Sequence, residues 1–421
     1  MDYKKATQAL HAGYTKDANM TMAVPIYQTT AYEYESTEQA ANRFALKELG
    51  NIYTRLANPT TNVLEERFAK IEGGAAAIAT SSGMSAIFFA IVNLAAAGEN
   101  IIASNQLYGG TVTLFGHTLK RFGIELRTFD IRKPEAIEGL IDDKTRAIFF
   151  ESISNPSIDV ADVAPIVSIA KKHRIVTVCD NTVATPFLFA PFDHGVDVTV
   201  YSASKYITGQ GLAIGGLMVE REGLIEILKN NPRYAHFNEP DASYHGLVYT
   251  ETPFPPFSLR ARLALCRDIG AIPAPMSSWL FIQGLEHLAL RMEKHSQNAF
   301  AVAKHLANHP KVKKVNYPLL EGDKNYTNAQ KYLKKGASGL LSFEVEDFET
   351  AKKIIDNTQL FSLVTNIGDS KSIITHPAST THQQLSADEL AACGVHQGLI
   401  RLSIGLEDAE DLIRDLDKAI G

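Results

Sequence analysis

Residues 198–211 read VTVYSASKYITGQG, and this stretch decides the fold. Its first half is a β-branched, apolar run of the kind found in strands that are buried on both faces of a sheet. The run ends in the polar residues Ser202, Ser204 and Lys205. In open α/β sheets, ligands bind beyond the carboxyl ends of the parallel strands. The stretch therefore predicts an α/β fold with a chemical site at the end of this strand.

Lys205 is a candidate nucleophile that forms a Schiff base with an aldehyde. Partial burial and neighbouring positive charge lower the pKa of a lysine amine and expose its lone pair. Ser202 and Ser204 lie on the same side of an alternating backbone, so both hydroxyls can donate hydrogen bonds to a phosphate. The alternative is a lysine that simply reaches water, which is the usual situation of this residue type.

A second apolar run, IVTVCD at residues 175–180, ends in Asp180. A carboxylate at the end of a buried strand needs a cationic partner or takes up a proton. The protonated ring nitrogen of pyridoxal phosphate is such a partner, and the carboxylate keeps it charged so that the ring withdraws electrons from the substrate. The alternative is that Asp180 caps the next helix.

A phosphate cradle is predicted where a short strand at residues 75–80 runs into Ser81, Ser82, Gly83, Met84 and Ser85. Bare backbone N–H groups at a helix N-terminus favour an anion. The segment is neither a GxGxxG nor a Walker loop, which disfavours dinucleotide and nucleotide binding. A serine-capped helix that binds nothing is the alternative.

The composition describes a globular protein of two or three domains, with 421 residues, 45% of them hydrophobic and 21% charged. The net charge of −6 provides no basic stripe for nucleic acid and no patch for a membrane surface. The N-terminal residues MDYKK lack an apolar signal core, and we expect a cytoplasmic protein without membrane spans. Cys179, Cys266 and Cys393 are predicted to be reduced packing residues, and no metal site is expected.

Strands alternate with helix-length intervals, which predicts a mainly parallel seven-stranded sheet covered by helices. Two of the expected strands end at Asp180 and Ser202. The other five cover residues 75–80, 100–104, 124–129, 147–151 and 214–219. Residues 1–58 are predicted to form an N-terminal arm that reaches a neighbouring subunit, and residues 59–275 the large domain. Residues 276–421 are predicted to form a smaller α+β domain, which begins with one long helix at 276–308.

Four more residues carry chemistry in these predicted elements. Tyr108 opens a helix after a strand and is placed to stack on a flat ring, and Asn155 precedes Pro156 in a turn beside the same ring. Arg401 stands in an apolar strand, where its planar fork matches a substrate carboxylate. Arg55 lies in the arm. The alternatives are plain packing for Tyr108, turn geometry for Asn155, an internal salt bridge for Arg401 and a solvated charge for Arg55.

Together these pieces resemble the fold-type I pyridoxal-phosphate enzymes of cysteine and methionine metabolism over nearly the whole chain. The resemblance rests on Tyr53-Thr54-Arg55, Ser82-Gly83-Met84, Tyr108-Gly109-Gly110-Thr111, Asn155-Pro156, Asp180-Asn181-Thr182, Ser202-Ala203-Ser204-Lys205-Tyr206 and Arg401-Leu402-Ser403-Ile404-Gly405. It implies pyridoxal phosphate as the cofactor and a two-domain fold with an N-terminal arm.

The resemblance also implies a role for each matching residue. Lys205 holds the cofactor covalently and moves protons, Asp180 holds the pyridine nitrogen, and Tyr108 stacks on the ring and assists at the leaving group. Asn155 contacts the ring, and Arg401 holds the substrate α-carboxylate. The phosphate shell is implied to comprise Ser82, Gly83, Met84, Ser202 and Ser204, with Tyr53 and Arg55 donated by the adjacent subunit of a homo-oligomer, typically a tetramer.

Within that family the chain is most similar to the O-acetylhomoserine sulfhydrylases. This likeness rests on residues 24–30, on the insertion around 240–246, and on 364–369 running to 376–382. Asn366 stands where lyase relatives usually have serine, and Gly110 where methionine γ-lyases have a reactive cysteine. Gln210, between two glycines where histidine is usual, and Ser204, where threonine is commoner, depart from the pattern.

The likeness implies that O-acetyl-L-homoserine and sulfide are converted to L-homocysteine and acetate in methionine biosynthesis, with Arg401, Asn366 and Tyr53 at the substrate. A cystathionine γ-synthase and a methionine or cystathionine γ-lyase use the same cofactor and remain open. So do a succinyl ester in place of the acetyl ester and a carrier protein as sulfur donor. A non-catalytic protein that keeps the fold is the alternative from another class.

Overall fold

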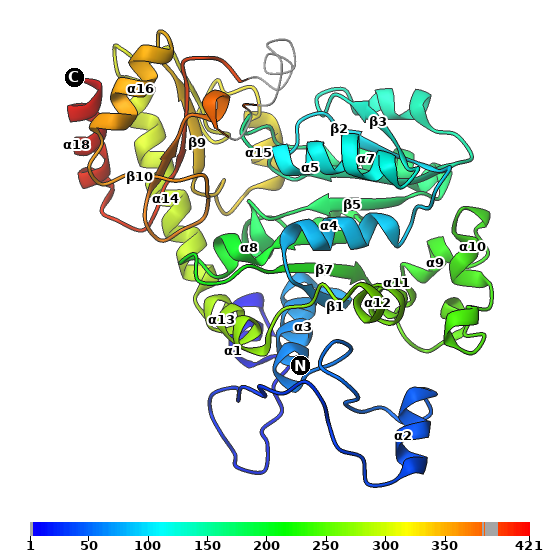
Figure 1. The fold of residues 1–421 in the computed structure, drawn as a ribbon. Coiled ribbons are helices and arrows are strands. Elements are labelled where there is room, and N and C mark those ends of the chain that lie inside the picture. The colour runs from blue at the N-terminus through cyan, green and yellow to red at the C-terminus, as the bar shows by residue number, and fades with distance from the viewer. Residues whose placement is uncertain (1–2, 381–382, 384–394) are drawn as a thin grey trace.

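The computed structural model describes residues 3–380, 383 and 395–421, and a seven-stranded sheet forms the centre of its larger part (Figure 1). The strands lie in the order β1-β7-β6-β5-β4-β2-β3. Their bounds are β1 Gly74–Thr80, β2 Asn100–Ser104, β3 Glu125–Phe129, β4 Thr145–Glu151, β5 Val176–Asp180, β6 Val198–Ser202 and β7 Gly216–Arg221. The predicted seven-stranded sheet is confirmed.

Strand β7 is antiparallel to both of its neighbours, β1 and β6, whereas β2 to β6 pair in parallel. It begins at Gly216, two residues later than predicted, because residues 211, 213 and 214 line a cavity instead of joining the ladder. In the parallel part, Glu151 at the end of β4 pairs with Asp180 at the end of β5. The carboxyl ends of β4, β5 and β6 therefore meet at one edge of the sheet.

Alternating side chains of β6 face two separate hydrophobic layers. Val198 and Val200 belong to the layer that includes α4 (Gly83–Val92) and α6 (Leu119–Arg121), whereas Tyr201 belongs to the layer that includes α3 (Pro59–Glu72) and α7 (Val163–His173). Helix α3 begins after the N-cap Asn58 with proline at its first position, and it ends at Gly73, whose φ is 86°. The sheet is thus covered on both faces, and polar groups emerge only at its edge.

The smaller domain is built on a five-stranded sheet in the order β10-β11-β12-β9-β8. Its strands are β8 Lys314–Asn316, β9 Leu340–Glu344, β10 Ser362–Leu363, β11 Ile373–Thr375 and β12 Leu399–Ser403, and its helices include α15 Tyr326–Tyr332, α16 Phe348–Asn357 and α18 Ala409–Ile420. Strands β10 and β11 are only two and three residues long. Such short strands leave no periodic signal.

The long helix expected at 276–308 is two helices, α13 (Pro275–Glu286) and α14 (Leu288–Leu306). The chain leaves helical geometry at His287, where ψ is 3°. Helix α14 runs from the large sheet toward the smaller domain (Figure 1). The predicted domain boundaries fall at the N-cap of α3 and at the start of α13, and they stay predictions.

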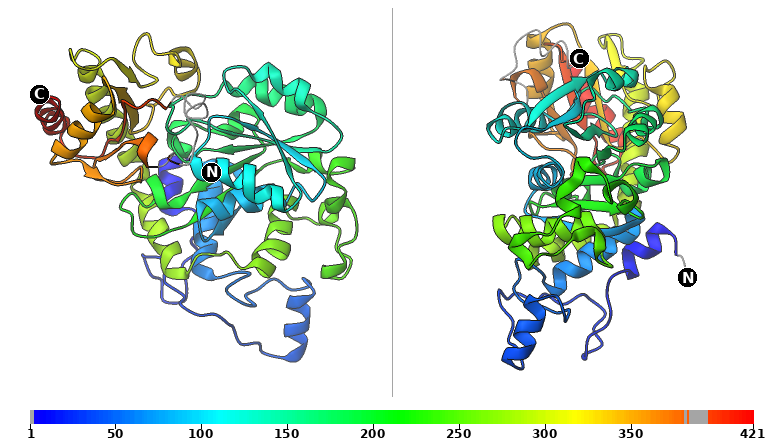
Figure 2. Two further views of the ribbon diagram at one scale, coloured as in Figure 1. Left: turned by 45° about the horizontal axis from the view of Figure 1, so that its top comes forward. Right: turned by 90° about the vertical axis from the view of Figure 1, so that its right-hand side faces the viewer.

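At the N-terminus, α1 (Lys5–His11) packs against α3 and α13. It is followed by an extended arm that contains α2 (Thr37–Phe44). This arm projects away from the rest of the chain in both views of Figure 2. Helix α2 ends at Phe44, and Leu46 soon after it adopts a positive φ of 56°. The remaining helices are α5 Gly109–Thr113, α8 Thr185–Leu188, α9 Ile225–Leu228, α10 Ala235–Asn238, α11 Pro256–Arg260 and α12 Arg267–Ile269.

Within the described residues, no helix combines the length and the apolar character that crossing a bilayer requires. The same part of the chain holds no cluster of three or more histidine, cysteine or acidic side chains arranged to bind a metal ion. Cys179 and Cys266 are buried and free. Cys393 and residues 381–382 of the segment 376–382 lie outside the described residues.

Candidate active site

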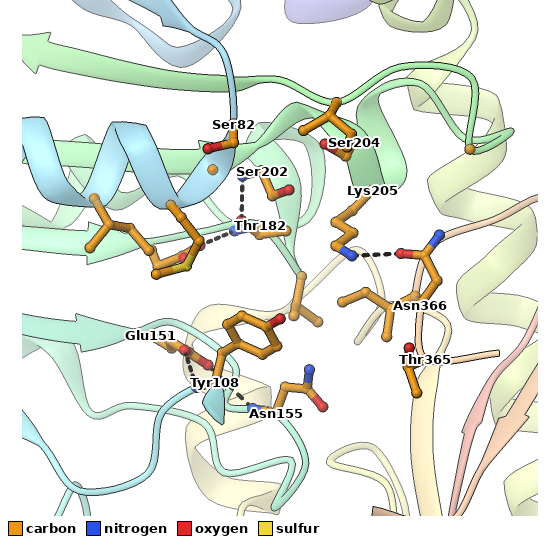
Figure 3. A pocket seen from close by; sticks show the side chains of 18 of the residues that line it. Ser82, Tyr108, Glu151, Asn155, Thr182, Ser202, Ser204, Lys205, Thr365 and Asn366 are labelled. Atoms are coloured by element: carbon orange, nitrogen blue, oxygen red, sulfur yellow. Dashed lines mark hydrogen bonds between the residues drawn. The ribbon is translucent and has the colours of Figure 1, made fainter. Parts of the chain in front are cut away.

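A cavity of about 390 Å³ opens at the carboxyl ends of β4, β5 and β6, between the large sheet and the smaller domain. It brings together eleven of the thirteen residues that the sequence predicted for the site. These are Ser82, Gly83, Met84, Tyr108, Asn155, Asp180, Ser202, Ser204, Lys205, Asn366 and Arg401. Figure 3 shows the three serines at one end of the cavity, Lys205 pointing into it, and Tyr108 and Asn155 at the other end.

Lys205 stands in a π-helical turn, Ala203–Ile207, directly after β6. Its own backbone is not helical, with φ −96° and ψ −125°, so the side chain is directed out of the turn. The guanidinium of Arg291 donates hydrogen bonds to the carbonyl oxygens of Tyr206 at 2.6 Å and Ile207 at 3.0 Å. Gly284 packs so close that a Cβ there would lie 2.0 Å from the Ile207 oxygen. Helices α13 and α14 therefore hold the turn in place.

The amine of Lys205 lies beside residues of the smaller domain. Its Nζ donates a hydrogen bond to Asn366 Oδ1 at 2.5 Å. Burial, and next the positive charge of Arg401, lower the pKa of Lys205 to about 8. A larger share of the amine is therefore uncharged near neutral pH than for an ordinary lysine.

Arg401 is 2% exposed and pairs with no carboxylate among the described residues. It donates to Asn155 Oδ1 at 3.1 Å and to the carbonyl oxygen of Asn366 at 2.9 Å, while its Nε is buried without a partner. Burial lowers its pKa to about 10. A buried guanidinium with an unused donor needs an anion, and a substrate carboxylate meets that need.

Asp180 ends β5, and its Oδ1 accepts a hydrogen bond from the backbone N–H of Thr182 at 2.9 Å. Burial raises the pKa of its carboxyl group. A cation placed beside it in the cavity would reverse that shift, because opposite charge favours the ionised form. The geometry therefore suits a carboxylate that holds a protonated ring nitrogen.

The N-terminus of α4 forms the serine-rich end of the cavity. The N-cap Ser82 accepts from the N–H of Ser85 at 3.0 Å, which leaves the first N–H groups of the helix for another acceptor. A Cβ on Gly83 would lie 2.7 Å from Ser202 Cβ, so only glycine permits this approach of α4 to β6. In contrast to Ser202, Ser204 uses its hydroxyl on the backbone of Gly215, donating at 3.3 Å and accepting at 3.0 Å.

Tyr108 and Asn155 lie at the opposite end of the cavity. Tyr108 is 42% exposed, and the lack of a side chain at Gly110 leaves room for its ring, because a Cβ there would lie 2.6 Å from Tyr108 Cε1. The backbone N–H groups of Tyr108 and Asn155 both donate hydrogen bonds to the carboxyl group of Glu151, at 2.6 Å and 3.2 Å respectively. The backbone segments that carry the Tyr108 ring and the Asn155 amide are thus hydrogen-bonded to one buried carboxyl group.

Tyr53 and Arg55 do not line this cavity within the chain. They lie in the exposed arm, where the Arg55 guanidinium sits 5.1 Å from the centre of the Tyr53 ring. Tyr53 is 40% exposed. Their predicted contribution to a neighbouring subunit stays a prediction.

Several residues that line the cavity were not predicted from the sequence. Glu151 and Thr182 are polar, and the apolar lining includes Ile87, Ile153, Val183, Ala213, Ile214 and Ile367. Glu151 carried a usable signal, because it is an acid at the end of a buried strand, as Asp180 is. The apolar residues carried none, since they look like ordinary core in sequence.

The donor set fits pyridoxal phosphate. The cavity supplies an amine of lowered pKa, a carboxyl group, and hydroxyl and helix N-terminal N–H groups at one end. These match the aldehyde, the ring nitrogen and the phosphate of that cofactor. The residues that would hold it are Lys205, Asp180, Tyr108, Asn155, Ser82, Gly83, Met84, Ser202 and Ser204.

Comparison with known proteins agrees with this site. Residues 6–421 match the family model described as Cys/Met metabolism PLP-dependent enzyme. The chain is 45% identical to an O-acetyl-L-homoserine sulfhydrylase of Leptospira meyeri, across 100% of this chain and 97% of that protein. It is 43% identical to a homocysteine synthase of Schizosaccharomyces pombe, across 98% and 97% of the two chains.

Among solved structures, the chain resembles an O-acetylhomoserine (thiol)-lyase from Campylobacter jejuni with a TM-score of 0.98 and 56% identity. The match covers 99% of this chain and 100% of that one, whose structure contains N'-pyridoxyl-lysine-5'-monophosphate at position 205. The family model and these full-length likenesses agree with the amine, acid and anion cradle described above. The chain therefore belongs to the Cys/Met metabolism PLP-dependent enzyme family.

Proposed function

We propose that this protein is a pyridoxal-phosphate-dependent O-acetylhomoserine sulfhydrylase, which converts O-acetyl-L-homoserine and sulfide to L-homocysteine and acetate. The observation that carries the proposal is the amine of Lys205, whose pKa is lowered to about 8, in one cavity with Asp180 and Arg401. The full-length likeness to relatives with this name supports the choice of substrate. The reaction belongs to methionine biosynthesis.

Pyridoxal phosphate supplies an aldehyde for the amine of Lys205 and a protonated ring that withdraws electrons from the substrate α-carbon. With the cofactor bound, the free amine of Lys205 would accept a proton from the substrate α-carbon and one from the β-carbon, and protons would return to both carbons after sulfide has replaced acetate. Asn366 Oδ1 holds the amine in place at 2.5 Å. Acetate then leaves from the γ-carbon, and sulfide adds at the same carbon.

Arg401 binds and orients the substrate through its α-carboxylate. Its buried Nε has no partner among the described residues and would donate to a carboxylate oxygen. The apolar side chains of Ile153, Val183 and Ile367 limit the access of water to the reacting carbons. Tyr108 covers the ring position and assists the departure of acetate.

We further propose a homotetramer built from dimers in which each arm completes the neighbouring site. The support is that Tyr53 and Arg55 lie on a protruding, exposed arm and outside their own cavity. Each would donate to the cofactor phosphate of the adjacent subunit, with Tyr53 also reaching the substrate. We place the enzyme in the cytoplasm.

The test is a product assay on the purified holoenzyme. O-acetyl-L-homoserine plus sulfide is expected to give homocysteine faster than the succinyl ester does. Cystathionine formed from cysteine would instead indicate a cystathionine γ-synthase, and 2-oxobutanoate released from methionine or cystathionine would indicate a lyase. A carrier protein with a C-terminal thiocarboxylate is the competing sulfur donor, and a higher turnover with it than with free sulfide would replace sulfide in the proposal.

Replacing Arg401 with methionine is expected to lower kcat/KM for O-acetylhomoserine by about 100- to 1000-fold, chiefly through KM. The change removes a charge-assisted, two-pronged contact with the carboxylate. Affinity for the cofactor should change little. Steady-state kinetics and a cofactor titration measure the two effects.

The matched control for the Arg401 variant is a substrate whose α-carboxylate is replaced by a carboxamide. The wild-type protein should discriminate strongly against this analogue, and Arg401→Met should treat the two compounds alike. An unchanged KM, or undiminished discrimination in the variant, would show that the carboxylate binds elsewhere.

A further inference from the structure

Glu151 is a buried acid that the reaction described above does not use. It ends β4, lines the cavity, and is 5% exposed. No lysine or arginine is hydrogen-bonded to its carboxyl group in the described part of the chain. Both of its oxygens accept backbone N–H groups instead, Oε1 from Tyr108 at 2.6 Å and Oε2 from Asn155 at 3.2 Å.

The two N–H groups belong to loops that are far apart in sequence. Tyr108 follows β2 and caps α5, and Asn155 follows β4. The side chain of Asn155 in turn accepts a hydrogen bond from Arg401 at 3.1 Å. Glu151 therefore links the backbone of Tyr108 to that of Asn155, whose side chain contacts Arg401, and Figure 3 shows Glu151 behind Tyr108 with its two contacts drawn.

We propose that Glu151 is a positioning residue that sets the Tyr108 ring over the cofactor and, through Asn155, sets Arg401 for the substrate carboxylate. The part of this inference that concerns the substrate rests on the proposed function. The part that concerns the cofactor does not. A side chain that only filled space would not need two acceptor oxygens in this place, since an apolar side chain of the same volume could fill it.

The electrostatics of the strand ends support this role. Glu151 and Asp180 are register partners on adjacent strands. Burial, and next the charge of Asp180, raise the pKa of Glu151 well above its ordinary value. The carboxyl group has two oxygens that can accept hydrogen bonds from the N–H groups, whereas a glutamine side chain has one.

The experiment is Glu151→Gln, with pyridoxal phosphate titrated into the apoprotein. Glutamine has one acceptor oxygen and one NH₂ group, so one of the two backbone N–H groups loses its partner. The Kd for the cofactor is expected to rise about tenfold, and the visible circular dichroism of the bound cofactor should change because the ring environment shifts. In the holoenzyme, kcat/KM for O-acetylhomoserine should fall about 10- to 100-fold.

Glu220→Gln is the matched control. Glu220 is a glutamate on β7 that is 1% exposed and accepts the backbone N–H of Ser258 at 2.8 Å, but it does not line the cavity. Burial raises its pKa to about 7, so it is also an acid of raised pKa. The same substitution there should leave the Kd, the dichroism and kcat/KM within about twofold of the wild type.

A double-mutant cycle shows whether Glu151 acts through the tyrosine. In a Tyr108→Ala background, Glu151→Gln should weaken cofactor binding by less than about threefold, because the ring it positions is gone. A full tenfold loss in that background, or equal losses for Glu151→Gln and Glu220→Gln, would overturn the proposal. If Glu151→Gln does not fold, Glu151→Asp, which withdraws both oxygens by one methylene, is expected to weaken the cofactor in the same direction.

The outcome can be separated from a failure of the proposed function. The cofactor titration and the dichroism require no substrate, so a wrong substrate assignment leaves both readable. A wild-type protein that binds pyridoxal phosphate without making homocysteine would contradict the proposed reaction alone. An unchanged Kd and dichroism in Glu151→Gln would contradict the positioning role alone.

Discussion

Lys205→Ala is expected to lower homocysteine formation by at least about 10⁴-fold. A well-placed general base alone contributes roughly 10²–10⁴-fold, and this variant also loses the covalent attachment of the cofactor. The purified variant should lack the visible absorbance that the wild-type protein shows with the cofactor. Turnover and the absorption spectrum of the same preparation are the measurements. Substantial turnover in the variant would remove Lys205 from the mechanism.

The control for Lys205 is Lys371→Ala, which changes an exposed lysine in the loop after Asn366 and should keep both activity and spectrum. The pH dependence provides a second check. Burial and Arg401 lower the pKa of Lys205 to about 8. Only the free amine attacks an aldehyde. The rate constant for the reaction of pyridoxal phosphate with the apoprotein should therefore rise about tenfold per pH unit below pH 8 and level off above it. A midpoint above about 10 would mean that the amine is an ordinary exposed lysine.

Asp180→Asn is expected to lower kcat by about 10²–10⁴-fold while the cofactor still binds. A neutral amide cannot hold the positive charge on the ring nitrogen, and losing one partner of a buried ion pair costs about 3–5 kcal/mol. The absorption maximum and its pH dependence should also change. The pairing predicts partial recovery with N-methylated pyridoxal phosphate, whose ring nitrogen carries a permanent positive charge.

Asp197→Asn is the matched control for Asp180. Asp197 is 2% exposed, accepts hydrogen bonds from Thr177 and pairs with Arg221 at 2.7 Å, but it lies outside the cavity. Its substitution should lower the melting temperature without changing the spectrum of the cofactor. If the two variants behave alike, or if the N-methylated cofactor restores nothing to Asp180→Asn, the role of the carboxylate at the ring nitrogen would be wrong.

Much of the fold could be predicted because its signals are local. The β-branched runs before Asp180 and Ser202 are strands, as their composition predicted. Polar residues at the ends of buried runs predicted the edge of the sheet where the cavity opens. Pyridoxal phosphate followed from the same residues, through their chemistry and the family resemblance.

Other features depend on contacts between distant residues. The helix at 276–308 is interrupted at His287, although its sequence shows no proline or glycine at that point. The hydroxyl of Ser204 is hydrogen-bonded to the backbone of Gly215, a contact that the sequence does not show, and its contact with phosphate stays a prediction. Strands β10 and β11 exist because they pair with each other and with β12, and their own sequence is too short to specify them.

The sequence by itself determined the chemical groups of this protein: an amine, an acid and an anion cradle, each at the end of a strand or the start of a helix. Only the tertiary structure decided how they act together. It brings Asn366 and Arg401 of the smaller domain beside Lys205, and it attaches Tyr108 and Asn155 to Glu151. The physical reason is that burial and a nearby charge lower the pKa of Lys205, and burial leaves Arg401 Nε without a partner. Burial and proximity both depend on which segments of the chain fold against each other.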